Sequence, residues 1–199
     1  MFLTLEPTTD IRGNVLAMVA NKLSLSARDR VLANMVIGSN GATSLHEDSA
    51  PLSPPADRTR FHQIRSLASG IVVGGRTYQR EHYEKVPLPV FVATRDPDLL
   101  SRDDGPNTHS LFFHLPPEEV LRIAAEREKG PILVEGGINV LLPLLKLQRV
   151  DRLFLTRSPI AGDNHFFDFN TLHHNYELSE SETVENVSFE QWRPRKLQS

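Results

Sequence analysis

Two segments of the chain run from a short apolar stretch directly into a pair of glycines. The first reads IVVGGRTY, with Gly74 and Gly75, and the second reads ILVEGGIN, with Gly136 and Gly137. Short runs of this kind are typical of strands that are buried on both faces of a sheet. Glycines at the end of such a strand permit a tight turn, and they also let a ligand approach bare backbone. Two such corners favour a ligand site at the carboxyl edge of one parallel sheet, although tight turning alone also explains either pair.

Strand and helix signals alternate along most of the remaining sequence, which favours a layered α/β fold with a largely parallel sheet. Strands are expected at 30–38, 71–73, 86–95, 131–134 and 151–160, and helices at 56–70, 115–130 and 138–148. Asp57 is the expected N-cap of the first helix and Gly70 its stop signal, while Pro143 is expected to kink or shorten the third helix. Residues 176–195 alternate around a polar turn and predict a closing antiparallel hairpin. We therefore expect one domain at 29–199, preceded by an N-terminal arm at 1–28.

Composition excludes several classes of function. The 199 residues include no cysteine, which excludes disulfides, cysteine nucleophiles and thiolate metal sites. The formal net charge of −3 gives no electrostatic case for binding nucleic acid or an anionic membrane. The eight histidines follow no zinc-binding spacing, so no metal is expected. We see neither a secretory signal nor a membrane-spanning run, and we expect a cytoplasmic protein.

Glu135 and Arg65 are the strongest candidates for polar groups inside a site. Glu135 ends an apolar strand beside a glycine corner, where it could accept hydrogen bonds from a heterocycle or transfer a proton; the alternative is an acid that serves a helix dipole. Arg65 falls within the apolar repeat of its helix, between Ile64 and Leu67. A partly buried arginine requires an anion, either a carboxylate of the protein or a ligand phosphate, unless its stem carries the charge outward.

Three further residues lie at the ends of expected strands or just after them. Thr77 either caps a helix or donates its hydroxyl to a phosphate. Thr94 and Arg95 could hold a 2′-phosphate and so favour NADPH over NADH, the alternative for Arg95 being an ordinary surface position.

Three blocks of sequence resemble a known family. NMVIGSNGATS, PPADRTRFHQIRSLASGIVVGGRTYQRE and ILVEGGINVLLPLLKLQRVDRLFLTRSPIAGD are similar, in order and spacing, to the pyrimidine reductase domain of the riboflavin pathway. The resemblance spans roughly residues 30–195. It implies a dihydrofolate-reductase-like three-layer fold, often in a homodimer, with a mostly parallel central sheet between helices. It also implies NADPH-dependent reduction of a phosphorylated ribosylamino-pyrimidine, whose ribose side chain becomes ribityl.

The resemblance and the residue patterns together predict a set of site residues. The expected NADPH contacts are Gly74, Gly75, Thr77, Glu81, Thr94, Arg95, Gly136, Gly137, Ile138, Asn139, Val140 and Leu141. The expected substrate contacts are Asn34, Ser49, Arg65 and Glu135, and the expected catalytic residues are Glu135 and Asn40. Asn40 stands in GSNG, where the family usually has S-x-D-G, so it can form hydrogen bonds but carries no charge. Two alternatives remain: a reductase of the same fold that acts on a pterin or another substrate, and a paralogue that binds NADPH without catalysis.

Overall fold

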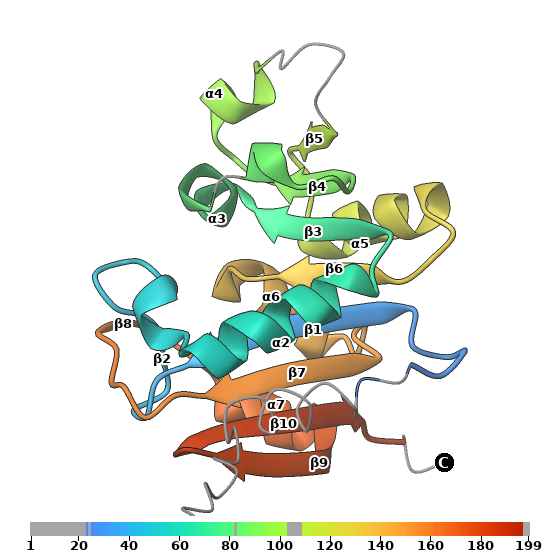
Figure 1. The fold of residues 1–199 in the computed structure, drawn as a ribbon. Coiled ribbons are helices and arrows are strands. Elements are labelled where there is room, and N and C mark those ends of the chain that lie inside the picture. Colours follow the sequence, from blue (N-terminus) through green and yellow to red (C-terminus); the bar gives the residue numbers. More distant parts are fainter. Residues whose placement is uncertain (1–22, 24, 82, 103–108, 197–199) are drawn as a thin grey trace, which may run out of the picture.

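The computed structural model describes residues 23, 25–81, 83–102 and 109–196, and its centre is an eight-stranded sheet (Figure 1). The strand order is β5-β4-β3-β6-β1-β7-β10-β9. All neighbours from β5 to β7 are parallel, whereas β10 runs antiparallel to both β7 and β9. The strands are β1 (Val31–Ile37), β3 (Gly70–Gly74), β4 (Val90–Ala93), β5 (Ser110–Phe113), β6 (Ile132–Glu135), β7 (Arg152–Arg157), β9 (Tyr176–Val184) and β10 (Val187–Pro194).

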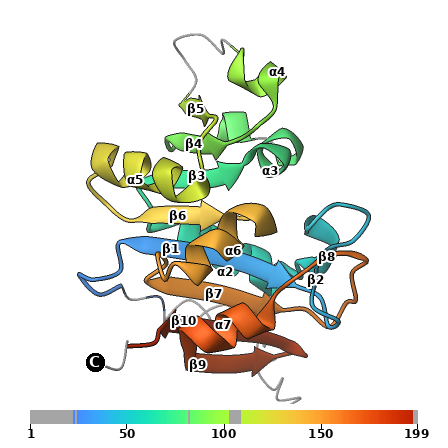
Figure 2. The same cartoon turned by 180° about the vertical axis from the view of Figure 1, so that it is seen from behind.

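Helices cover both faces of this sheet, as the sequence predicts. Helix α2 crosses one face, and α5, α6 and α7 cover the opposite face (Figures 1 and 2). The α-helices are α2 (Pro55–Ser66), α3 (Gly75–Arg80), α4 (Pro97–Leu100), α5 (Pro117–Arg127), α6 (Ile138–Lys146) and α7 (Phe169–Asn175), and the 3-10 turns are η1 (Ala50–Leu52) and η2 (Tyr83–Lys85). The expected three-layer α/β architecture is therefore confirmed.

Side chains of the central strands alternate between two apolar clusters. Leu32 and Leu133 pack with Ile64 of α2 on one face. Their neighbours Ala33 and Val134 face the larger cluster beneath α5, α6 and α7. Because both faces are covered, these strands are apolar at nearly every position instead of at every second one.

The predicted C-terminal hairpin is formed by β9 and β10. Glu185 and Asn186 connect them with positive φ angles of 48° and 66°. Two consecutive positive φ values define the kind of two-residue turn whose twist matches a hairpin.

Two local predictions about the helices are wrong. The N-cap of α2 is Pro54, and Asp57 lies in the first turn, where its carboxylate accepts a 2.5 Å hydrogen bond from the hydroxyl of Ser53. Helix α2 ends at Ser66, so that Gly70 is the first residue of β3 and does not stop the helix. Helix α6 contains Pro143 as an interior residue and ends at Lys146, two residues before the expected end at 148.

Several elements lie outside the predicted pattern. Strand β5 and helices α4 and α7 were not anticipated, nor was the small sheet that pairs β2 (Ala42–Ser44) with β8 (Asn164–Phe166). The arm expected at 1–28 falls largely on residues 1–22 and 24, which lie outside the described residues. No helix of the described chain combines the length and apolar character that crossing a bilayer requires.

Candidate active site

The two glycine corners lie side by side at the carboxyl edge of the sheet. Strands β3 and β6 are neighbours, with Val72 opposite Val134, and each leads into its corner. Gly136 and Gly137 have φ angles of 63° and 73°, which side chains other than glycine rarely adopt. A Cβ atom on Gly137 would lie 3.2 Å from Thr77 Oγ1 and 3.9 Å from the backbone nitrogen of Gly74. The predicted adjacency of the corners is confirmed, and the side chains of Thr77, Thr94 and Val140 pack directly against their glycines.

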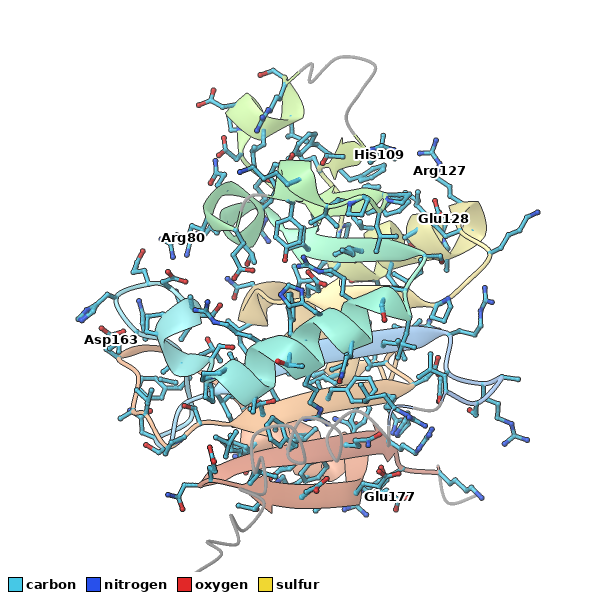
Figure 3. All side chains as sticks on the ribbon, in the orientation of Figure 1. Arg80, His109, Arg127, Glu128, Asp163 and Glu177 are labelled. Atoms are coloured by element: carbon cyan, nitrogen blue, oxygen red, sulfur yellow. The ribbon has the colours of Figure 1, made fainter. Side chains whose placement is uncertain are left out.

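Both corners open into one cavity of about 1270 Å³. Ligand sites commonly enclose about 300–1,000 Å³, so this cavity has room for a dinucleotide together with a small substrate. The lining comes from the ends of β1, β3, β4 and β6, from one side of α2, and from the loop around η1. In Figure 3, Arg80 and Asp163 lie on one side of the molecule, whereas Arg127 and Glu128, at the C-terminal end of α5, lie on the other. Arg80 belongs to the cavity lining.

Arg65 and Glu135 form a bidentate ion pair beside the second corner. The guanidinium of Arg65 donates from Nε to Oε1 of Glu135 at 2.7 Å and from Nη2 to Oε2 at 2.5 Å. The side chain of Glu135 is 1% exposed and that of Arg65 is 20% exposed. The anion that partly buried Arg65 requires is thus a carboxylate of the protein. Paired geometry of this kind is the strongest form of arginine–carboxylate contact.

Aromatic and amide groups surround this pair. Phe61 and Tyr83 have ring centroids 4.4 Å and 5.6 Å from the guanidinium carbon of Arg65. Burial, reinforced by the nearby charge of Glu135, raises the pKa of Tyr83 well above 10, so its hydroxyl stays protonated. Asn34 is the partner of Glu135 across the β1–β6 ladder and also lines the cavity. The pair therefore stands in a mostly protein-lined setting with two uncharged polar neighbours.

Glu81 is the second carboxyl group near the reaction space, at the C-terminal end of α3. The hydroxyl of Ser49 donates a hydrogen bond to its Oε1 at 3.0 Å. Glu81 is open to solvent through the cavity, but protein atoms surround it, and this desolvation raises its pKa above 4.5. The charges of Glu135 and Asp48 raise the pKa further, while the bond from Ser49 and the charge of Arg65 oppose them.

The remaining predicted cofactor contacts also belong to the cavity lining. Thr77 is not the cap of α3, whose N-cap is Gly74; instead its side chain stands against the Gly136–Gly137 corner. The hydroxyl of Thr94 accepts a 3.0 Å hydrogen bond from the backbone nitrogen of Asp96, which leaves its own proton available to donate. Arg95 is exposed at the cavity lining. Of the predicted cofactor contacts, only Leu141, fully buried in the core, lies outside the lining.

Asn40 lies outside the cavity lining and has structural partners. Its amide nitrogen donates to the carbonyl oxygen of Gly162 at 2.8 Å, and its amide oxygen accepts from the backbone nitrogens of Gly162 at 3.1 Å and Ala42 at 3.3 Å. These bonds fasten the loop after β1 to the segment before β8. The geometry accounts for asparagine here without a catalytic role, so Asn40 is not carried into the proposed chemistry.

Cavity residues on α2 were not singled out from the sequence. Arg58, Phe61 and His62 line the cavity and precede Arg65 on the same side of the helix. The signal was present, because residues spaced by three, four and seven positions share a helix face. The apolar members of that stripe, Phe61 and Ile64, indicate a core-facing side and conceal its polar neighbours. Arg76, directly after the first corner, is another lining residue that was not predicted from the sequence.

The fold places the chain in a known structural class. A dihydrofolate reductase from Enterococcus faecalis, complexed with NADP(H), superimposes with a TM-score of 0.62 at 16% identity, covering 84% of this chain and 98% of that one. A pyrimidine reductase-like protein from Corynebacterium diphtheriae gives a TM-score of 0.63 at 20% identity, covering 92% and 99%. These likenesses establish a dihydrofolate-reductase-like fold.

The family follows from a direct match of sequence. Residues 31–187 match the RibD C-terminal domain, and the chain belongs to that family. A bifunctional deaminase and 5-amino-6-(5-phosphoribosylamino)uracil reductase from Thermotoga maritima has a TM-score of 0.66 at 16% identity, and the match covers 84% of this chain. The chain spans only 57% of that protein's length. Family and fold together place the chain among the RibD C-terminal domains, with a dihydrofolate-reductase-like fold.

A second likeness points elsewhere. The large ribosomal subunit protein uL6 of Bacteroides fragilis is 27% identical over 128 residues, which is 64% of this chain and 67% of that protein. The corresponding protein of Phocaeicola vulgatus is 26% identical over the same length. We assign no ribosomal role on this basis, because the RibD C-terminal domain match extends over more of the chain and agrees with the fold.

Proposed function

We propose that the protein is an NADPH-dependent reductase acting on a phosphorylated ribosylamino-pyrimidine. The observation that carries the proposal is that two glycine corners and Glu135, which is held by Arg65 from behind the lining, meet in one cavity. In this arrangement dinucleotide and substrate would be neighbours. Family membership supports the reaction class, and the cofactor and substrate are our inference.

The residues present fit a dinucleotide phosphate. Gly74 and Gly137 contribute backbone to the cavity lining and would form a cradle for it, and a Cβ at either position would press on Val140 at 3.1 Å or on Thr77 Oγ1 at 3.2 Å. Backbone N–H groups at such corners and the Thr77 hydroxyl would bind the pyrophosphate oxygens. Arg95 and the Thr94 hydroxyl would hold the 2′-phosphate that distinguishes NADPH from NADH. When bound, the reduced cofactor would supply hydride.

The substrate would occupy the half of the cavity that α2 and the η1 loop enclose. Because Glu135 engages Arg65 in two hydrogen bonds, we assign the substrate phosphate to Arg58 and His62, cavity residues one helical turn apart on α2. Asn34 and Ser49 offer hydrogen bonds to a pyrimidine ring. The ion pair would then fix the orientation of the ring, and positioning would provide most of the rate.

Binding and turnover test the proposal separately. Calorimetry with NADPH and NADH measures cofactor choice, and the loss of reduced-nicotinamide absorbance measures turnover with the ribosylamino-pyrimidine and, in parallel, with dihydrofolate. We expect tight NADPH binding and oxidation only with the pyrimidine. Oxidation with dihydrofolate alone would assign the chain to another substrate, and tight binding without turnover would indicate a non-catalytic NADPH-binding protein.

Two further expectations belong with this proposal. We infer a homodimer, because the resemblance to the pyrimidine reductases implies one, and sedimentation velocity at working concentrations would test it. We also infer a cytoplasmic enzyme that binds neither nucleic acid nor membrane, in agreement with its net charge of −3. Cell fractionation would test the location.

A further inference from the structure

Two carboxyl groups reach the same cavity in different surroundings. Both oxygens of Glu135 already accept hydrogen bonds from Arg65, and its side chain is 1% exposed. Proton transfer from Glu135 would break a buried ion pair, and this carries a large free-energy cost. Among the described residues, Glu81 accepts a hydrogen bond from Ser49 alone, on Oε1, and it is open to the cavity. The two groups are therefore suited to different tasks.

The neighbours of Glu81 favour the protonated form. Asp48 and Ser49 face it from the η1 loop, Glu135 from β6, Arg65 from α2, and Tyr83 from η2. Desolvation is the largest cause of its raised pKa, followed among the raising effects by the two carboxylates. Arg80, another residue of the cavity lining, is paired with Glu47. Pairs of acids whose environments differ in this way commonly divide the roles of proton donor and fixed charge.

We propose that Glu81, and not Glu135, is the proton donor of the reduction, with Ser49 as its positioning residue. This inference rests on the proposed function. The substrate's open-chain carbon–nitrogen double bond gains hydride at carbon, and its π electrons move to nitrogen. That nitrogen takes the proton of the Glu81 carboxyl group, and the resulting carboxylate regains a proton from water at the open side of the cavity. Hydride plus proton completes the two-electron reduction, and NADPH becomes NADP⁺.

The ion pair then has a separate part in the same chemistry. Arg65 and Glu135 remain bonded throughout, so the negative charge of Glu135 stays beside Glu81 and favours a proton there before transfer. Tyr83 keeps its hydroxyl proton, and its buried ring packs beside the guanidinium of Arg65. This division explains why a carboxylate held by arginine and an unpaired carboxyl group are found together.

The variant Glu81→Gln tests the donor role by removing the proton while keeping the size. We expect the rate of NADPH oxidation to fall by about 10²–10⁴-fold, as for loss of a general acid, with NADPH affinity unchanged by calorimetry. The wild-type rate should fall as pH rises through the pKa of Glu81. This descending limb of the pH–rate profile should be missing in Glu81→Gln. Glu81→Asp should restore part of the rate together with the limb, and Ser49→Ala should shift the limb to higher pH.

A second measurement is independent of turnover. In carbon-13 spectra of protein labelled at glutamate carboxyls, the resonance that Glu81→Gln removes should titrate above 4.5, the ordinary value for glutamate. A titration at or below that value overturns the inference. A Glu81→Gln variant that keeps the wild-type rate and pH profile also overturns the inference. A Glu81→Gln variant that loses NADPH binding overturns it too, because Glu81 would then be a cofactor contact. If wild-type protein with bound NADPH reduces nothing, the proposed function fails as well.

Discussion

The ion pair between Arg65 and Glu135 sets a measurable part of the stability. Replacing Arg65 with methionine leaves the 1% exposed carboxylate of Glu135 without a partner. Removing one member of a buried pair typically costs about 3–5 kcal/mol. We expect about 2–4 kcal/mol for Arg65→Met, because Arg65 is 20% exposed and water in the cavity can partly replace it. The loss includes the contact of its guanidinium with Phe61 at 4.4 Å.

Urea unfolding followed by tryptophan fluorescence is a suitable assay. Trp192 is the only tryptophan, is 6% exposed, and lies in β10, away from the substitution. The double variant Arg65→Met/Glu135→Gln should recover much of the loss, since neither charge then remains. Arg58→Met on the same helix is the matched control and should stay within about 0.5 kcal/mol. The reasoning would be refuted if Arg65→Met lowered the free energy of unfolding by less than about 0.5 kcal/mol. It would also be refuted if a double-mutant cycle showed no coupling energy between positions 65 and 135.

Three other expectations follow from the structure. Gly137→Ala should lower NADPH affinity at least about tenfold, while Gly41→Ala, which has a comparably positive φ of 85° outside the cavity, should lower stability alone; equal affinities in calorimetry would argue against the cradle. Arg95→Met should weaken NADPH by about 10–100-fold and leave NADH unchanged, as loss of a charge-assisted phosphate bond requires; parallel losses for both cofactors would count against a 2′-phosphate site. Buried Asp29, bonded to Arg152 and Arg193, has a pKa held below 3.8, so its contribution is present above that value and lost as pH falls through the lower folded pKa. The stability gap between wild type and Asp29→Asn in urea titrations should therefore narrow below pH 3.8, and a gap constant with pH would contradict this.

Sequence patterns predicted the centre of the fold because that part obeys a simple rule. The strands around Leu32, Val72 and Val134 are covered on both faces, so each is a short apolar run that is easily recognised. Strand β5 was not predicted from the sequence because its residues Ser110–Phe113 lie at the outer edge of the sheet, where none of them is fully buried. Helix α7 begins at an N-cap, Asp168, that was visible, but its histidines concealed the apolar spacing of a short helix.

The site was predicted as a set of positions and only partly as a set of contacts. Strand ends indicated where Gly74, Gly136 and Glu135 would lie, because parallel strands deliver their carboxyl ends to one edge. Pairing of Arg65 with Glu135 joins residues 70 positions apart, and spacing along the chain carries no record of such a meeting. The same holds for Ser49 with Glu81, whose partnership depends on how the η1 loop folds back over α3.

The central position of β1 has a consequence for how the chain acquires its shape during synthesis. Val31 pairs with Ile132 and Leu32 with Arg152, so the earliest strand of the sheet finds both neighbours only in the last third of the polypeptide. Such long loops must close before their contacts stabilise anything, which slows folding and leaves apolar edges uncovered meanwhile. A ribosome-bound fragment ending before β6 should therefore hold β1 without a partner strand, and maturation should occur in a late, cooperative step after release.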